Sequence, residues 1–84
     1  MKSSTTPDFR ERLAALPLEI RRSAVKNYRL WCANPRHPSL HFKPVGEYWS
    51  VRVGANHRAL GRKRRGEMIW FWIGSHDEYE RLIK

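Results

Sequence analysis

Apolar side chains in the first third of the chain recur every three or four residues, which is the spacing of amphipathic helices. A first helix should begin at Thr6-Pro7-Asp8, which supplies a capping hydroxyl, a proline at the first helical position and an acid in the first turn. Pro17 begins a longer helix that Asn34-Pro35 ends. The apolar faces hold Phe9, Leu13 and Leu16, and then Ile20, Ala24, Tyr28 and Trp31. This spacing predicts a helical hairpin with a basic outer face formed by Arg22, Lys26 and Arg29.

After the helices, the spacing changes to the short alternating runs of strands separated by turn residues. The predicted strands cover residues 40–44, 48–53, 57–62 and 67–73, with turns between them. In the second strand Trp49, Val51 and Val53 alternate with polar residues, so one face should be core and Arg52 should point away from it. The fourth strand is apolar on both faces, as expected of a central strand. These runs predict an antiparallel meander.

A final helix is predicted at the C-terminal end, directly after the fourth strand. Ser75 and Glu78 have the spacing of a capping box, which places His76 at the first helical position. Together the elements predict one α+β domain over residues 1–84. In it an N-terminal helical hairpin packs on an antiparallel sheet of three to four strands, followed by a short C-terminal helix.

Charge adds information about the partner of this domain. Seventeen Lys and Arg residues face 8 Asp and Glu in a chain of 84, giving a net charge of +9. Between Ile20 and Gly66 the only acid is Glu47, so the basic character belongs to the folded middle of the chain. Such a surface is expected of a protein that meets nucleic acid or an acidic protein.

Cysteine content and hydropathy limit the compartment. The single cysteine, Cys32, excludes an internal disulfide and a cysteine-based zinc site, and we expect it to be a small buried residue. The first six residues lack the apolar segment of a secretory signal. The longest apolar run, Met68 to Ile73, is far shorter than the roughly 18 residues of a spanning helix. We therefore expect a cytoplasmic protein without a membrane partner.

Three bases, Lys43, Arg52 and Arg58, fall on three consecutive predicted strands. Neighbouring strands lie about 4.8 Å apart, so the three side chains could converge on one phosphate if their registers agree. The alternative is a scattered, solvated basic face. Arg58 shares its parity with Leu60, which leaves open the face on which it lies.

His76 and Tyr79 are three residues apart and share a face of the last helix. They are candidates for proton transfer beside a scissile phosphate, which the free N–H groups of a helix start could also hold. Two alternatives stay open. Tyr79 could form, with Leu82 and Ile83, the apolar stripe that docks the helix. The neighbouring acids could occupy the positive end of the helix themselves.

Other polar and aromatic groups give weaker signals. The basic run Arg62, Lys63, Arg64 and Arg65 could grip an RNA backbone or be a solvated hairpin tip. The tryptophans could stack on bases, although a domain this small needs most of them in its core. His37 and His41 straddle Pro38, so we predict no metal site. No glycine-rich phosphate loop, nucleophile elbow or carboxylate pair is present, and no cofactor is expected.

Three segments taken in order carry a family resemblance: residues 34–43, residues 50–60 with Ser50-Val51-Arg52-Val53-Gly54 and His57-Arg58-Ala59-Leu60, and residues 70–79. Together they resemble the RelE/ParE superfamily of toxins from type II toxin-antitoxin modules, most of all its HigB-like members. The resemblance implies a microbial-ribonuclease-like α+β fold. It also implies a toxin that cuts mRNA on the ribosome without a metal and is neutralised by a cognate antitoxin.

By position, the resemblance assigns phosphate binding and charge stabilisation to Lys43, Arg52 and Arg58, and acid-base work to His76 and Tyr79. Many relatives have Tyr-Arg where this chain has His57-Arg58, which makes His57 a further candidate base. The well-studied nucleases carry an arginine near the position of Asp77, so this chain departs from them there.

From the resemblance as a whole we expect a ribosome-dependent mRNA endonuclease. The alternatives are a non-enzymatic toxin that inhibits a protein such as DNA gyrase, and a basic RNA-binding module.

Overall fold

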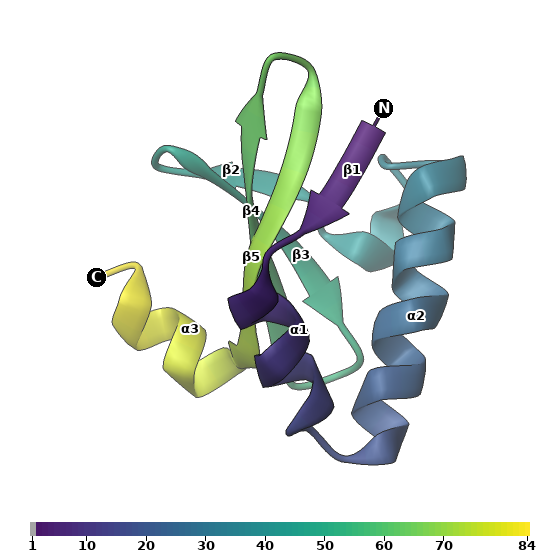
Figure 1. The fold of residues 1–84 in the computed structure, drawn as a ribbon, viewed down its shortest axis with the longest axis vertical. Coiled ribbons are helices and arrows are strands. Elements are labelled where there is room, and N and C mark those ends of the chain that lie inside the picture. Colours follow the sequence, from purple (N-terminus) through teal and green to yellow (C-terminus); the bar gives the residue numbers. More distant parts are fainter. Residues whose placement is uncertain (1) are drawn as a thin grey trace.

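The structure, a computed structural model that describes residues 2–84, combines one five-stranded sheet with three helices. Figure 1 shows its elements in chain order: β1 (Lys2–Thr5), α1 (Pro7–Ala14), α2 (Leu18–Ala33), one turn of 3₁₀ helix (Pro38–Leu40), β2 (Lys43–Val45), β3 (Tyr48–Val53), β4 (His57–Arg64), β5 (Glu67–Ser75) and α3 (His76–Leu82). The predicted α+β class, the helical hairpin and the short last helix are confirmed.

The sheet has the strand order β1-β5-β4-β3-β2. Strands β2 to β5 form the antiparallel meander that the sequence predicts. The prediction of three to four strands omitted β1, which pairs in parallel with β5, with Lys2 opposite Glu67 and Thr5 opposite Trp70. The sequence Lys2-Ser3-Ser4-Thr5 has no apolar alternation, because this edge strand is held by backbone hydrogen bonds and buries little side chain.

Strands β4 and β5 are longer than predicted and meet in a two-residue turn. Arg65 (φ 48°) and Gly66 (φ 81°) both adopt the left-handed conformation of the tight hairpin turn. Three of the four bases expected at the hairpin tip, Arg62, Lys63 and Arg64, therefore belong to β4.

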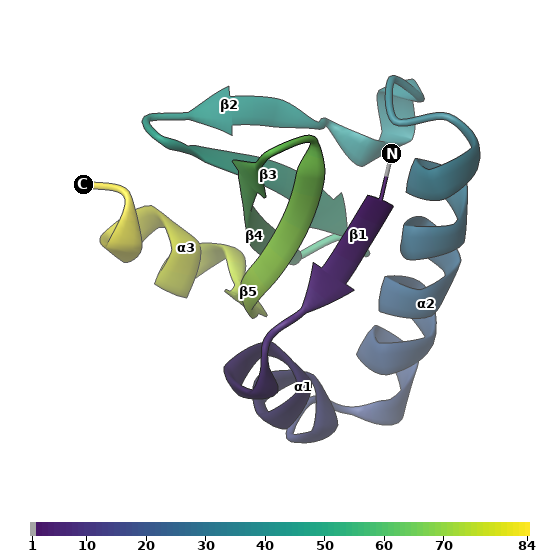
Figure 2. The ribbon, with the colours of Figure 1, turned by 45° about the horizontal axis from the view of Figure 1, so that its top comes forward.

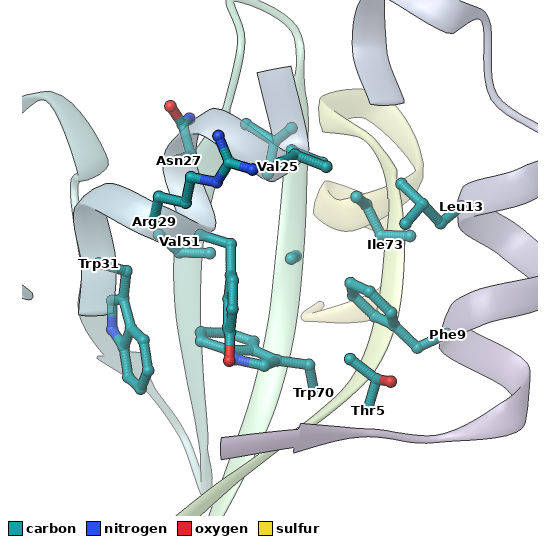
Figure 3. Close-up of a pocket in the computed structure, with 14 residues that line it drawn as sticks. Thr5, Phe9, Leu13, Val25, Asn27, Arg29, Trp31, Val51, Trp70 and Ile73 are labelled. Atoms are coloured by element: carbon teal, nitrogen blue, oxygen red, sulfur yellow. The ribbon is translucent and has the colours of Figure 1, made fainter. Parts of the chain in front are cut away.

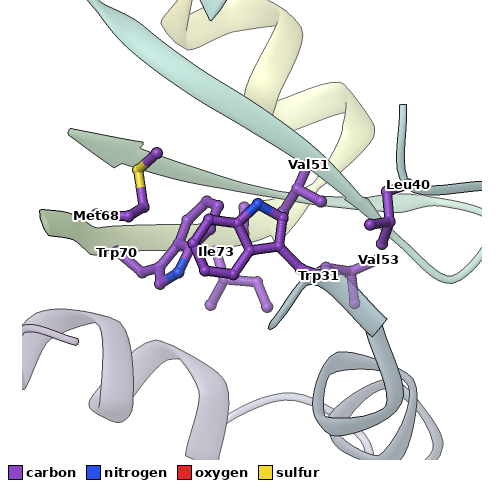
Figure 4. Close-up of a cluster of buried hydrophobic side chains, with 8 residues drawn as sticks. Trp31, Leu40, Val51, Val53, Met68, Trp70 and Ile73 are labelled. Carbon is purple, nitrogen blue, oxygen red and sulfur yellow. The ribbon is translucent and has the colours of Figure 1, made fainter. Parts of the chain in front are cut away.

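The larger core lies between the sheet and the first two helices, with α1 packed on β5 and α2 on β3. Trp31 of α2 is 2 % exposed and makes an edge-to-face contact with Trp70 of β5 at 5.3 Å (Figure 4). Met68, Val51 and Ile73 close this core from the sheet. The prediction that Cys32 is buried is wrong, because the residue after the inward-facing Trp31 lies on the outer side of α2.

A smaller core lies on the opposite face of the sheet, beneath α3. A β-bulge beside Leu60 and Gly61 shifts the register, so Trp70 pairs with Gly61 while Trp72 pairs with Leu60. Trp72 then joins Leu60 and Tyr79 in this second cluster. Helices α2 and α3 accordingly lie on opposite sides of the sheet (Figure 2).

Tyr79, 2 % exposed, is the residue of α3 that is buried against the sheet. Leu82 and Ile83 remain 55 % and 39 % exposed, so the predicted docking stripe is reduced to one aromatic ring. Within residues 2–84, none of the helices is both long enough and apolar enough to span a bilayer.

Gly61 offers a test of the bulge. A Cβ atom there would lie 2.7 Å from Cε3 of Trp70 and 2.8 Å from Sδ of Met68. We expect Gly61→Ala to lower the free energy of unfolding by about 1–3 kcal/mol through overpacking, as measured by denaturant titration. Gly46→Ala is the control: Gly46 (φ 59°) has nothing within 4 Å of the added atom, so only backbone strain should appear. Equal losses in the two variants would contradict the proposed crowding.

Candidate active-site cleft

A polar cleft of about 420 Å³ opens where β3 ends, β4 begins and β5 passes into α3. Its charged and titratable wall residues are His41, Arg52, His57, Arg58, His76 and Asp77. The strand register assembles this wall, because Arg52 lies directly opposite Arg58 and His57 lies opposite Ser75. Residues far apart in the sequence therefore meet at one end of the sheet.

Arg58 is the most enclosed polar residue of the wall, with 7 % of its surface exposed. Its Nε donates to Ser50 Oγ at 2.8 Å, and its Nη2 donates to the His41 carbonyl oxygen at 3.1 Å. The guanidinium carbon lies 5.2 Å from the centroid of the Tyr79 ring. The face that the sequence left open is thus settled: Arg58 lies with Leu60 on the α3 side, at the edge of the smaller core.

Burial lowers the pKa of Arg58 from its ordinary value, and the nearby Arg52 lowers it as well, while Tyr79 and Glu80 act to raise it. An arginine nevertheless stays charged at neutral pH. The cleft therefore contains a fixed positive charge whose orientation is set by the hydrogen bonds that Arg58 donates to two other segments.

Arg52 is half-buried beside Arg58 and points away from the larger core, as predicted. Its Nε donates to the Gly54 carbonyl oxygen at 2.9 Å, while Asn27 Nδ2 of α2 donates to the Arg52 carbonyl oxygen at 2.8 Å. Two guanidinium groups on adjacent strands make this part of the cleft strongly positive.

The start of α3 carries the capping box that the sequence predicts, with Glu78 N donating to Ser75 Oγ at 3.1 Å. The His76 N–H donates to the Asn56 carbonyl oxygen at 2.7 Å. These N–H groups already have partners, so the helix start is less open to a phosphate than the sequence suggested. The His76 side chain lines the cleft, and its Nε2 lies 3.0 Å from Oε1 of Glu80.

Tyr79 lies beneath the cleft and does not line it. Its ring centroid is 5.8 Å from that of His76, and its buried hydroxyl has no hydrogen-bond partner among the described residues. The packing alternative thus describes its ring well, while the hydroxyl lacks the partner that a buried polar group normally has.

Two further histidines line the cleft. His57 was a sequence candidate, and its buried Nδ1 has no partner among residues 2–84. His41 was considered only as half of an unlikely metal pair. It reaches the cleft because it follows the 3₁₀ turn in the left-handed conformation (φ 46°) and its carbonyl accepts from Arg58. That placement depends on a tertiary contact, so no local pattern could reveal it.

The remaining basic candidates lie outside the cleft. Lys43 is exposed on β2 opposite Ser50, on the same face of the sheet as Arg58. Arg62 lies over the Tyr48 ring at 5.5 Å and Lys63 over the Trp49 ring at 5.9 Å. Arg64 and Arg65 line a separate depression at the hairpin tip. At about 3.3 Å per residue, Arg62 is roughly 13 Å along β4 from the cleft.

A second hollow, of about 310 Å³, is an apolar groove between α1, α2 and the sheet (Figure 3). Phe9 and Leu13 line it from α1, and Trp70 forms part of its floor. Val25 is 46 % exposed and lines both this groove and a shallow depression along α2 whose other wall residues include Arg21, Arg22 and Lys26. Across residues 2–84, no three His, Cys, Asp or Glu side chains gather closely enough to hold a metal ion.

The cleft geometry suits chemistry at an anion. Two arginines can stabilise negative charge that builds on phosphate oxygens, and three imidazole rings can donate or accept hydrogen bonds beside it. Asp77 adds one negative group to the same wall.

Comparison with known proteins identifies the fold. A YoeB/ParE toxin from Agrobacterium tumefaciens is 19% identical with a TM-score of 0.69, covering 90% of this chain and 99% of that one. A chain of the RelB-RelE antitoxin-toxin complex from Methanococcus jannaschii is 20% identical with a TM-score of 0.66, and the match covers 95% of this chain and 98% of that one. A copper-bound mutant toxin from Helicobacter pylori is 14% identical with a TM-score of 0.63, and the match covers 93% of this chain and 97% of that one.

The structural matches show the fold, whereas a family model of sequences shows the family of the chain. No curated protein matches the chain by sequence. Residues 19–81, however, match the family model described as a ParE-like toxin domain, and this match spans most of the chain. The chain therefore belongs to the family of ParE-like toxin domains.

Proposed function

We propose that this protein is the HigB-like toxin of a type II toxin-antitoxin module and acts as a ribosome-dependent mRNA endonuclease that needs no metal. The observation that carries the proposal is the convergence of Arg52 and Arg58 with three histidines on one cleft. A protein that only binds and blocks a target has no need of several proton-transfer groups around fixed positive charge.

The proposed reaction is attack of a ribose 2′-OH on the adjacent phosphate, with departure of the 5′-oxygen. Negative charge builds on the phosphate oxygens, where Arg52 and Arg58 would stabilise it. One histidine takes the proton of the 2′-OH, and another gives a proton to the leaving oxygen. Arg58 is already oriented by Ser50 and His41, so little reorganisation is needed when the charge appears.

Outside the cleft, RNA would be held by basic side chains that lie on the same face of the sheet or continue along β4. Lys43 lies across from Ser50, whose hydroxyl holds Arg58. Four basic residues at the end of β4 and in the turn after it are all exposed: Arg62, Lys63, Arg64 and Arg65. Because RNA and the ribosome are polyanions, these contacts would add affinity without specifying sequence.

The proposed partner is a cognate antitoxin that is acidic and amphipathic. The related RelE toxin occurs in a complex with its antitoxin RelB. In this chain the apolar groove beside Val25 borders a shallow depression on α2 that is lined by Arg21, Arg22, Lys26 and Arg29. A partner segment with an apolar face and acidic flanks matches that surface in both shape and charge.

A second candidate function is inhibition of a protein target such as DNA gyrase without catalysis. The family description is ParE-like, and Asp77 places a negative charge in the cleft where RNA phosphate would approach. A simple RNA-binding module is the third candidate. Primer-extension mapping of transcripts after induction separates the three, because only the proposed nuclease would cut translated messages at codon positions.

His76→Gln tests the chemistry. The change keeps a polar side chain at the start of α3 but removes the titrating ring, and His76 is exposed, so the melting temperature should hardly change. We expect the cleavage rate of bound mRNA to fall by roughly a hundredfold or more. A folded variant that cuts at the wild-type rate would remove His76 from the reaction, and the same result for Arg52→Ala would favour the binding-inhibitor alternative.

Tyr79 is proposed to act on the phosphate through Arg58. Tyr79→Phe keeps the ring beneath the guanidinium, and we expect cleavage within a few-fold of wild type. Tyr79→Ala should remove the anchor of α3, lower stability by about 3 kcal/mol or more, and abolish cleavage. Thermal unfolding and single-turnover cleavage measure the two effects. A hundredfold loss in Tyr79→Phe would instead assign proton transfer to the hydroxyl.

The hairpin tip is tested by changing Arg62, Lys63, Arg64 and Arg65 together to Gln. We expect weaker ribosome binding and a shallower dependence of affinity on salt, because fewer counterions are released. Cleavage of bound message should persist. The matched control changes four basic residues of α2 together to Gln: Arg21, Arg22, Lys26 and Arg29. Equal losses of affinity in both sets would show that total charge, and not the tip, determines binding.

A further inference from the structure

The side of the sheet that carries the cleft continues along β4 to the turn between β4 and β5. Because side chains alternate along a strand, Arg58, Arg62 and Arg64 point to this same side. The strand register places Ile69 opposite Arg62 and Glu67 opposite Arg64, so these two residues of β5 share it. At the turn end a polar depression is lined by Lys2, Arg64, Arg65, Glu67 and Ile69. One strand therefore connects two hollows rich in positive charge.

Between the two hollows lies a stack of aromatic and cationic groups. The guanidinium carbon of Arg62 is 5.5 Å from the centroid of the Tyr48 ring, and the rings of Tyr48 and Phe71 have centroids 5.0 Å apart. Both rings are half-buried against the smaller core, whereas Arg62 is exposed. Helix α3 starts at the end of β5 that lies farthest from the turn (Figure 1). The guanidinium is thus the outer layer of the stack, and the core holds the ring beneath it.

An exposed guanidinium that lies over a ring is a place where a base can stack. Unpaired RNA bases stack on arginine guanidinium planes as well as on aromatic rings, and this contact is open to any base. Of the tryptophans that the sequence suggested for this role, Trp70 and Trp72 are only 3 % and 7 % exposed, so their rings are not available. A duplex does not fit the contact beside Arg62, because its bases are already stacked on one another.

The charges on both sides of the stack match the backbone of a single strand. The two arginines of the cleft can hold a phosphate at one end, and Lys2, Arg64 and Arg65 can hold another at the turn. Glu67 is the acid of the second depression, and three basic groups outnumber it there. A stacking group between two positively charged sites is the arrangement expected for binding of single-stranded nucleic acid.

We infer that single-stranded RNA runs along β4 from the cleft to the turn, with one base stacked on the Arg62 guanidinium above the Tyr48 ring. The inference rests on the proposed function, because the strand that reaches the cleft is its substrate. Arg62 is roughly 13 Å along β4 from Arg58, so the stacked base belongs to a nucleotide outside the cleft. The contact favours unpaired RNA over a duplex without selecting a sequence.

Arg62→Lys tests the stack, because lysine keeps the positive charge and loses the planar group. The probes are a short synthetic RNA strand, its duplex with the complementary strand, and an abasic strand of the same length that keeps the phosphates. We expect Arg62→Lys to weaken binding of the single strand by roughly fivefold or more, while binding of the duplex and the abasic strand stays within about twofold of wild type. Fluorescence anisotropy at low salt measures these affinities.

Two further variants accompany this comparison. Arg36→Lys is the matched control, since Arg36 is an exposed arginine in the loop after α2, and it should bind all three probes as the wild-type protein does. Tyr48→Leu removes the ring beneath the guanidinium and should reproduce the loss on the single strand. Circular dichroism checks that this variant is still folded.

The inference is overturned if Arg62→Lys weakens binding of all three probes equally, because Arg62 would then be only a phosphate contact. It is also overturned if the affinity of Arg62→Lys for the single strand equals that of wild type. Failure of the wild-type protein to bind any probe, while it still binds an acidic antitoxin, would assign this face to protein docking instead. Absence of cleavage by the wild-type protein on translating ribosomes would refute the proposed nuclease function and leave the strand-binding result to be judged by itself.

Discussion

The arrangement of the cleft depends on one interaction, the enclosure of the Arg58 guanidinium. A buried charge is tolerated only when its hydrogen-bonding groups are met, and here Ser50 on β3 and the carbonyl of His41 meet two of them. The Tyr79 ring covers it from α3. Three other segments are therefore tied to this one side chain of β4. Each of them also brings a residue of the proposed active site to the cleft, so the packing around Arg58 determines the shape of the cleft.

The two unequal cores explain why this site forms at one end of the sheet. The larger core holds α1 and α2 against one face, and its aromatic contacts do not involve the cleft. On the other face the smaller core ends at Arg58, because α3 is short and buries one tyrosine. At that end of the sheet, next to the start of α3, the surface is formed by the polar side chains of the cleft. The cleft is thus the edge of the smaller core, where packing gives way to charge.

Local patterns in the sequence predicted the elements whose stability is local. The capping box at Ser75 and the alternation along β3 both appear as expected. The elements that were missed depend on distant partners. Strand β1 has a polar sequence and exists because β5 offers an open edge, and His41 reaches the cleft through its bond to Arg58. The parity of Arg58 could not be resolved either, because the face it shares with Leu60 is neither wholly apolar nor wholly exposed.

The bulge in β5 divides that strand into two phases. In a regular strand Trp70 and Trp72 would point to the same side, yet here they belong to opposite cores because Phe71 is inserted between the paired positions. Before the bulge, Met68 and Trp70 face the helical hairpin; after it, Trp72 faces α3 and Ile73 faces the hairpin. The number of residues in β5 therefore cannot change, even by one, without reversing the side chains that follow the bulge. Losing or gaining one position there would turn Trp72 to the wrong face and leave Tyr79, and with it Arg58, without support.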